Sequence, residues 1–270
     1  MKTPRTSLGL LFLSSAALCL LNACSSLSVD LPVSRFELPE TNGREAHRTQ
    51  ISAQLESSHK YEMTPDAGVR PPNFSRPTID TEAAFGAHGS YGIADHFDLS
   101  LKTSLGRSPW MLFGKYQILG ENLENATEGN VSLALTGGVG YAQSTNKGDQ
   151  NGTFGAGGYN WEGQITTLAT DAALIAGYRA SDSVLFYASG FYSNYRMEAK
   201  INQSASDNGL SAGGEYRNAE NAYQRGANLG LALSVGTRGL LKLEGIYSDL
   251  ATGRPNNWIL SYGASMGTRF

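Results

Sequence analysis

Apolar and polar residues alternate with a period of two along most of the chain after residue 48. The pattern is clearest in the final stretch, 258–270, where the intervening residues are mostly small or polar. One set of alternate positions there suits an apolar medium: Trp258, Leu260, Tyr262, Ala264, Met266, Thr268 and Phe270. This period predicts a strand with two different faces, and the stretch is longer than the five or six residues usual for a soluble strand.

The same alternation, interrupted by turn signals, predicts about ten strands in all. They cover residues 48–63, 82–93, 97–105, 110–118, 131–141, 161–179, 185–197, 227–235, 241–247 and 258–270. Eight strands is the alternative, because 120–130 is long for a tight turn and 107–109 is short for a loop. An even number places both ends of the chain on one side of a closed barrel.

Two predicted strands and one loop depart from simple alternation. Trp161 has the opposite parity to Leu168 and Leu174, which predicts a bulge or a late strand start. The polar stretch Ala199–Ala222 predicts the longest loop. In 185–197, the apolar outer face is expected to carry Leu185, Tyr187, Phe191, Tyr195 and Met197, although Phe186 and Tyr192 have the other parity.

Composition agrees with a chain made of strands. Glycine (32 residues) and tyrosine (13 residues) are abundant, while charged residues make up only 17%. Beyond the first segment, no apolar run approaches the length of a transmembrane helix. A barrel can still cross a membrane with such a sequence, because only alternate residues face lipid. The formal net charge of −3 indicates neither a nucleic acid nor another polyionic partner.

A long strand that ends the chain on the aromatic residue Phe270 resembles the closing strand of bacterial outer-membrane β-barrel proteins. The resemblance implies an all-β fold, a transmembrane antiparallel up-and-down barrel with short periplasmic turns and long external loops. It also implies that Phe270 is the assembly signal, and that outer-membrane lipids and the barrel-assembly machinery are partners. Short connections at 94–96, 180–183 and 237–239 then face the periplasm, and long ones at 64–80, 144–160 and 199–222 face outward.

The aromatic residues fit two interfacial belts of such a barrel. The outer belt is expected to contain Tyr61, Trp110, Tyr141, Tyr195, Tyr223, Tyr247 and Trp258. The inner belt is expected to contain Tyr91, Phe97, Tyr178 and Phe270.

The first residues form a targeting segment. Lys2 and Arg5 precede the short apolar run Leu8–Leu21, as in a secretory signal peptide. The sequence Leu21-Asn22-Ala23-Cys24 resembles the lipobox of bacterial lipoproteins, where the cysteine becomes the acylated first residue. This implies palmitate at Cys24, the lipoprotein-sorting machinery as a partner, and the outer membrane of a Gram-negative bacterium as the location. A conventional signal peptide with an incidental cysteine is the alternative.

These features divide the chain into three parts. Residues 1–23 are the lipoprotein signal peptide, 24–47 an acylated N-terminus and periplasmic tether, and 48–270 the barrel. Proline residues and the Asn42-Gly43 turn signal favour a tether, because they interrupt regular structure.

The inward face of the predicted barrel carries charges of both signs. These are Arg48, Glu56, Lys60, Glu82, Asp98, Lys102, Asp171, Arg179, Lys242 and Glu244, together with Lys115, Arg196, Glu198 and Arg269. A ring of one sign would indicate ion selectivity, whereas a mixture indicates salt bridges that fill a narrow lumen.

One short motif suggests catalysis. His88-Gly89-Ser90 is similar to the H-x-S motif of the outer-membrane lipid A deacylases, in which histidine and serine work with an acidic residue. His88 and Ser90 share one strand face, but that face is the lumen, and a lumen histidine without catalytic function is the favoured interpretation. The sequence predicts no metal site, no cofactor and no nucleic-acid patch.

We therefore expect a non-enzymatic outer-membrane barrel lipoprotein with a structural or surface-interaction role through its external loops. The external ligand is unknown. A small porin-like channel is the first alternative, and a deacylase-like enzyme that modifies lipid A is the second.

Overall fold

The computed structural model describes residues 26–43, 49–66, 73–74, 77–150, 159–207, 210–252 and 258–270. Within these ranges it contains thirteen strands: β1 (Leu27–Pro32), β2 (Thr49–Met63), β3 (Pro65–Asp66), β4 (Asn73–Phe74), β5 (Thr78–Ala94), β6 (Phe97–Ser104), β7 (Trp110–Leu119), β8 (Val131–Gln150), β9 (Tyr159–Ser181), β10 (Val184–Asp207), β11 (Leu210–Val235), β12 (Gly239–Ala251) and β13 (Trp258–Arg269). None of the described residues belongs to a helix that is long and apolar enough to cross a membrane.

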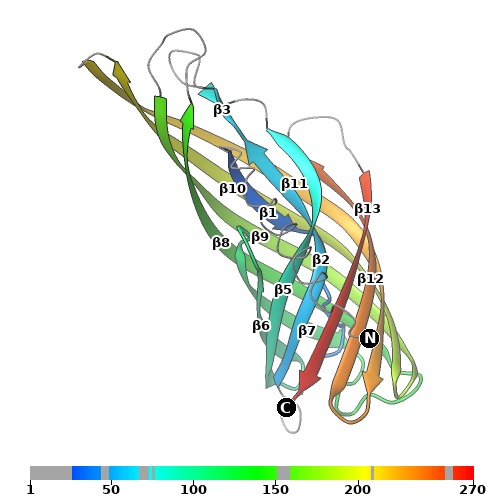
Figure 1. Cartoon of the computed structure of the whole chain (residues 1–270). Coiled ribbons are helices and arrows are strands. Elements are labelled where there is room, and N and C mark those ends of the chain that lie inside the picture. The colour runs from blue at the N-terminus through cyan, green and yellow to red at the C-terminus, as the bar shows by residue number, and fades with distance from the viewer. Residues whose placement is uncertain are drawn as a thin grey trace, which may run out of the picture.

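Ten of the described strands form a closed antiparallel ring. The order runs from β2 through β13, β12, β11, β10, β9, β8, β7 and β6 to β5, which pairs again with β2. Within the ring, closure gives each wall strand a hydrogen-bonded neighbour on both sides, as a sheet in hydrocarbon requires. The predicted ten-stranded antiparallel barrel is therefore confirmed, and β1 is an eleventh strand attached to β2 (Figure 1).

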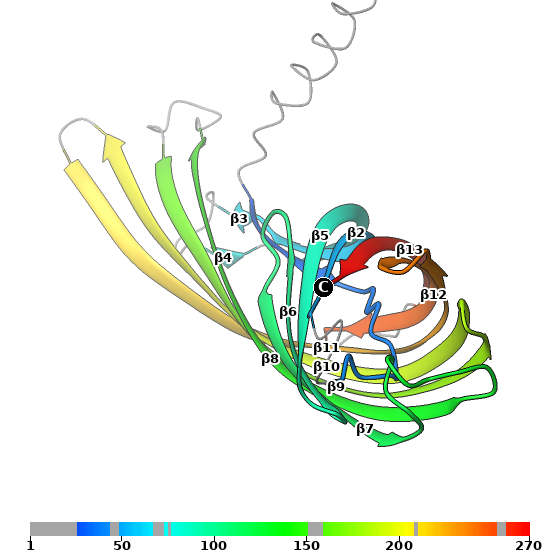
Figure 2. The same cartoon turned by 90° about the horizontal axis from the view of Figure 1, so that it is seen from below.

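The two ends of the barrel differ. At one end lie the connections β5–β6, β7–β8, β9–β10 and β11–β12, and we call it the turn end. We call the other end the loop end. It contains the connections from β2, β6, β8, β10 and β12 to the next wall strands. Strands β8–β11 extend far beyond the ring at the loop end (Figures 1 and 2).

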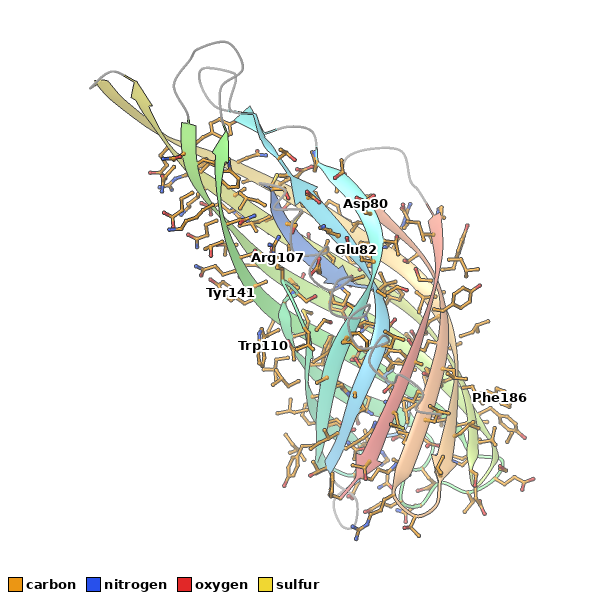
Figure 3. All side chains as sticks on the ribbon, in the orientation of Figure 1. Asp80, Glu82, Arg107, Trp110, Tyr141 and Phe186 are labelled. Atoms are coloured by element: carbon orange, nitrogen blue, oxygen red, sulfur yellow. The ribbon has the colours of Figure 1, made fainter. Side chains whose placement is uncertain are left out.

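Large apolar side chains cover the outside of the barrel, on all ten wall strands. This apolar belt includes Ile51, Leu55, Phe85, Tyr91, Leu99, Leu101, Trp110, Leu112, Tyr116, Leu135, Val139, Tyr141, Leu168, Leu174, Tyr178, Phe186, Tyr192, Tyr223, Leu229, Leu243, Tyr247, Leu260, Tyr262 and Met266. Figure 3 labels three of its aromatic residues, Trp110, Tyr141 and Phe186, which project from the outer surface. A soluble protein rarely exposes a continuous apolar surface of this kind, whereas hydrocarbon solvates it.

The height of the belt matches a bilayer. On β8 it extends from Val131 to Tyr141, ten residue steps, after which Gln143, Thr145 and Lys147 are exposed. Ten steps measure about 34 Å along a strand, or about 26 Å along the axis of a barrel whose strands tilt by about 40°. The apolar band of outer-membrane barrels is about 25 Å tall.

Beyond the belt, at the loop end, the apolar side chains of the strands point inward and the polar ones point outward. On β9, Leu168 faces outward within the belt, while Trp161 and Ile165 face inward beyond it and are buried. They pack against β1 and the end of β2 in one core of Leu27, Val29, Leu31, Tyr61, Met63, Met111, Phe113, Ala142, Trp161, Ile165, Ala169, Tyr195, Met197, Ala199, Ile201, Ala222 and Leu250. This packing makes a loop-end sandwich: β1 and the end of β2 form one layer, and the projecting parts of β8–β11 form the other.

The sandwich corrects several predictions. Trp161 needs no bulge, since the β8–β9 and β9–β10 registers are continuous around it, and it faces inward because the core there is protein rather than lipid. Tyr61 and Tyr195 belong to this core instead of the outer aromatic belt. The charged residues Arg196 and Glu198, expected in the lumen, are exposed on the outer face beyond the belt.

The parity predicted for 185–197 is wrong. Leu185, Tyr187 and Phe191 face inward and are buried, whereas Phe186 and Tyr192 face outward. The inward residues pack around Leu38 and Val33 of the N-terminal segment. A polar lumen would require polar residues on this inner face, but the N-terminal residues inside the barrel provide an apolar surface instead.

The predicted loops at 144–160 and 199–222 are largely strands. β8 reaches Gln150, β9 begins at Tyr159, and β10 and β11 pair from Val184↔Leu233 to Asp207↔Leu210. The strands stay hydrogen-bonded beyond the apolar belt. In that region, however, parts of both sheet faces can meet water, so apolar and polar residues no longer alternate regularly. Polar composition therefore indicated loops where the structure has a long hairpin.

Candidate functional site

The N-terminal segment Ser26–Gly43 fills the barrel, and we call it the lumen segment. At the loop end, Leu27 pairs with Met63, and Asn146 Nδ2 of β8 donates to the Ser26 carbonyl at 2.7 Å. At the turn end, Thr41 Oγ1 donates to the Asp95 carbonyl at 2.6 Å. The segment thus runs through the lumen from the loop end to the turn end (Figure 2). A periplasmic tether was expected over 24–47, but its described residues, 26–43, lie inside the barrel.

Three wall lysines bind the backbone of the lumen segment at alternate residues. Lys102 of β6 donates to the Ser34 carbonyl. Lys242 of β12 donates to the Phe36 carbonyl at 2.7 Å. Lys115 of β7 donates to the carbonyls of Leu38 at 3.2 Å and Glu40 at 2.7 Å. We call these residues the lysine ladder; they satisfy carbonyl groups that would otherwise be buried without partners.

Glu244 provides the complementary acceptor on β12. Its carboxylate accepts the backbone N–H groups of Arg35 at 3.0 Å and Phe36 at 2.7 Å. It also accepts from Tyr187 Oη at 3.0 Å and Asn228 Nδ2 at 2.9 Å. A buried carboxylate with several donors is well solvated by the protein, which explains how Glu244 is accommodated at 3% exposure.

Arg35 is the central side chain of the segment. Its guanidinium donates to both oxygens of Asp171, at 2.7 and 2.6 Å, and lies over the rings of Phe113 and Phe191 at 5.9 and 5.2 Å. A bidentate arginine–carboxylate pair fixes both distance and plane. This pair therefore fixes the segment at one height in the barrel.

The turn end holds the segment through a further set of polar contacts. Glu40 pairs with Arg179, and Asn130 Nδ2 donates to Glu40 at 3.0 Å. The Thr41 N–H donates to Gln117 Oε1 at 2.7 Å, and the Asn42 N–H donates to Asp98 at 3.1 Å. The unexpectedly long turn at 120–130 takes part, because the Leu123 N–H donates to the Thr41 carbonyl at 2.8 Å.

Apart from Arg196 and Glu198, the charged residues predicted for the lumen divide into four groups. Lys115 and Arg269 are partly buried; Lys115 pairs with Asp98 at 3.0 Å, and Arg269 donates to Ser234 Oγ at 3.3 Å. Seven are buried inside the barrel: Glu56, Asp98, Lys102, Asp171, Arg179, Lys242 and Glu244. Lys60 and Glu82 form a partly exposed pair at 3.3 Å towards the loop end, where Glu82 is labelled in Figure 3. Arg48 lies outside the described residues, as does Cys24.

His88 and Ser90 also face the lumen. Ser90 Oγ accepts from Asn42 Nδ2 at 2.8 Å, so the serine contacts the lumen segment. Neither nitrogen of His88 has a hydrogen-bond partner, so the described geometry contains no His88–Ser90 hydrogen bond that would activate the serine. Both side chains are buried behind the wall and away from the apolar belt.

Two small cavities lie beside the described lumen segment. One cavity next to Arg35 and another next to His88 each measure about 20 Å³. A volume of this size holds about one water molecule. Among the described residues, buried wall charges contact the segment and each other.

Sequence patterns did not predict the lumen segment. Its signal was present in Leu27, Val29, Leu31 and Val33, which alternate with Ser28, Asp30 and Pro32. The contacts with the lysine ladder could not be predicted from the sequence, because every residue has a backbone carbonyl that can accept a hydrogen bond.

Phe270 completes the ring at the turn end. Its N–H donates to the Thr49 carbonyl at 2.8 Å, and the Thr49 N–H donates to the Phe270 carbonyl at 3.3 Å. Its side chain is exposed.

Fold and site together define a membrane-spanning antiparallel β-barrel whose lumen is filled by its own N-terminal segment. No protein-family model matches the chain, and no curated protein sequence matches it. The barrel is similar to the N-terminal β-barrel domain of Pseudomonas aeruginosa OprF, with 11% identity, a TM-score of 0.23, and coverage of 84% of this chain and 100% of that one.

Two further solved structures are similar at the same level. Vibrio cholerae OmpT, an outer membrane protein, has 12% identity, a TM-score of 0.19, and coverage of 82% of this chain and 96% of that one. The outer membrane channel DcaP of Acinetobacter baumannii has 8% identity, a TM-score of 0.20, and coverage of 91% and 97%. At these identities and TM-scores the likeness carries no argument about function.

Proposed function

We propose that this protein is a non-conducting outer-membrane β-barrel lipoprotein of a Gram-negative bacterium, which displays the loop-end sandwich at the cell surface for structural or surface-interaction purposes. Outer-membrane lipids and the barrel-assembly and lipoprotein-sorting machineries are its expected partners. The observation that carries the proposal is the lumen segment, because it fills the channel that a porin would keep open.

The loop-end sandwich supports the surface role. Its outer face carries exposed polar residues such as Lys147 and Glu162, which pair at 3.1 Å, while its inner face is a closed apolar core. Strands that merely crossed the membrane would need no core beyond the belt. An ordered structure outside the bilayer provides a rigid surface to which a partner can bind.

Conductance in planar bilayers tests the closed lumen. The purified wild-type protein is expected to give no single-channel steps. A variant with Leu27→Cys and Met63→Cys, whose positions pair directly, locks the segment to β2 when oxidised. If the wild-type protein gives conductance steps and the oxidised variant does not, the proposal is wrong and the barrel is a channel gated by the segment.

The surface role is tested by shortening the β10–β11 hairpin. Replacing residues 203–216 with a two-glycine turn removes its tip and leaves the belt intact. In cells that lack the wild-type gene, this variant should restore the envelope's resistance to hydrophobic dyes, but lose surface cross-links that the full-length protein forms. Retention of every cross-link would argue against an interaction through this hairpin.

The lipid A deacylase alternative has its own test. Mass spectrometry of lipid A from cells that overproduce the wild-type protein or His88→Ala should give the same acylation pattern, because His88 and Ser90 are not hydrogen-bonded to each other and face away from lipid. Deacylation that depends on His88 would establish the enzymatic alternative.

A further inference from the structure

We propose that the N-terminal lipid anchor enters the outer leaflet, beside the loop end of the barrel, and not the periplasmic leaflet. This inference rests on the proposed function, which supplies the acylated Cys24 and the outward orientation of the loop end. It goes beyond that function because an outer-membrane lipoprotein could carry its anchor on either side.

The direction of β1 carries the argument. β2 starts at the turn end, where Thr49 bonds with Phe270, and ends at the loop end with Met63. β1 is antiparallel to β2, with Leu27 opposite Met63 and Pro32 opposite Ser58. The chain therefore enters the barrel at the loop end and descends towards the turn end.

Distances exclude the periplasmic leaflet. Ser26 contacts Asn146, which lies five residue steps beyond the belt residue Tyr141 on β8. Five steps correspond to about 13 Å along the barrel axis, whereas the far edge of the belt is about 26 Å further away. Cys24 lies outside the described residues, but two residue steps from Ser26 reach at most about 7 Å. Only the nearer leaflet is within range of such a tether and its lipid.

The wall also has an unpaired strand edge at this place, on β8. The β6–β7 hairpin is short and ends at Ser104 and Trp110, and Trp110 pairs with Tyr141 of β8. From Ala142 to Gln150, β8 pairs with β9 but with no described strand on its other side. Ser26 lies beside this unpaired edge, because its carbonyl accepts from Asn146 Nδ2 of β8.

The β6–β7 hairpin, next to this unpaired edge, binds the start of the segment. Arg107 donates through its backbone N–H to Asp30 Oδ2 at 3.3 Å and through its side chain to Ser28 Oγ. Trp110 and Tyr141 lie below Arg107 on the outer surface, at the level where aromatic side chains mark the membrane interface (Figure 3). The acyl chains of Cys24 would enter the bilayer beside these two rings.

β2 changes its pairing partner along its length, which explains why the segment is held inside the closed barrel. Gln50–Leu55 of β2 pair with β13, whereas Ser58–Met63 pair with β1. The Val33 N–H bonds to the Ser57 carbonyl at 3.1 Å, at the point of change. The segment therefore occupies the edge of β2 that β13 leaves free, and it must be in the lumen when the ring closes.

Biotin-acceptor tags at three positions test the leaflet. One tag is inserted between Ser25 and Ser26, one at the β10–β11 tip and one in the β11–β12 turn after Gly236, each in the full chain. Streptavidin on intact cells should bind the first two tags, and should bind the third only after permeabilisation.

Each other outcome has a distinct meaning. If the tip tag is accessible and the tag before Ser26 is accessible only after permeabilisation, the inference is wrong and the proposed function stands. If the turn tag is accessible on intact cells and the tip tag is not, the barrel is inverted and the proposed orientation fails as well.

A disulfide test covers the case in which the tag prevents folding. Leu27→Cys with Met63→Cys should form a disulfide in intact membranes, because directly opposed residues of antiparallel strands lie within bonding range. The matched control, Leu27→Cys with Thr49→Cys, places the second cysteine at the other end of β2 and should not cross-link. Cross-linking of the control pair alone would overturn the direction of threading.

Discussion

Arg35 and Asp171 form a bidentate ion pair across the inside of the barrel, with both nitrogen–oxygen distances below 3 Å. The two residues are far apart in the sequence and come from the lumen segment and from β9. Both side chains are almost fully buried. The pair therefore couples the position of the N-terminal segment to the wall.

The first prediction concerns this pair. Asp171→Asn removes the bidentate partner of the buried Arg35 and leaves only Glu37, whose carboxylate lies 3.3 Å from the guanidinium. The free energy of unfolding should fall by up to about 3–5 kcal/mol, the cost of breaking a buried ion pair. The midpoint of the heat-induced mobility shift on gels measures the loss. Adding Arg35→Met to Asp171→Asn should restore part of the stability. If the loss of stability in the double variant equals the sum of the losses in the two single variants, the two residues are not coupled.

An exposed ion pair provides the control. Lys147→Ala removes the partner of Glu162, but both side chains are more than half exposed. Such pairs contribute about 0–1 kcal/mol, so the mobility-shift midpoint should change little.

The second prediction concerns the loop-end sandwich. Trp161 is 3% exposed and packs in the core with Leu27 and Ile165. Trp161→Ala should cost about 3–5 kcal/mol locally. Limited proteolysis should then cut the loop end while the membrane-embedded part stays protected. Glu162→Ala, on the exposed face of the same strand, should leave proteolysis unchanged; equal cleavage of the two variants would mean that Trp161 is not a core residue.

The third prediction concerns the facing of β13. Ala264 lies on the lipid side, opposite Leu243 of β12 and Leu55 of β2. Ala264→Arg places a charge near the middle of the membrane and should cost about 2–4 kcal/mol. Thr268→Arg has the same facing but lies near the interface, where the cost falls to about 0–1 kcal/mol. Urea titrations in lipid vesicles compare the two, and equal stabilities would show that this face does not meet lipid.

The fourth prediction concerns Phe270. Its backbone closes the ring with Thr49, and its exposed ring is the expected assembly signal. Deleting Phe270 should reduce the heat-modifiable fraction in the outer membrane more than it lowers the unfolding midpoint of the protein that does assemble. Phe270→Tyr keeps an aromatic ring and should assemble normally. Normal assembly of the deletion variant would remove this role from Phe270.

The sequence by itself determined the wall of the barrel. Alternation along 131–141 and 258–270 depends only on the two-residue period of a strand and on the difference between lipid and lumen, so it is readable locally. The number of wall strands and the short turn at 94–96 followed for the same reason. Residues such as Asp98, Lys102 and Glu244 were placed on the inward face by parity alone.

Only the tertiary structure decided what that inward face contacts. The lysine ladder binds backbone carbonyls, which have no sequence signature, and Arg35 finds Asp171 only when the chain passes through the lumen. The inverted parity at Trp161 and Leu185 arises because the medium on the inner side is protein rather than water. Alternation reports that the two faces of a strand differ, but the identity of the medium on each face depends on distant segments of the chain.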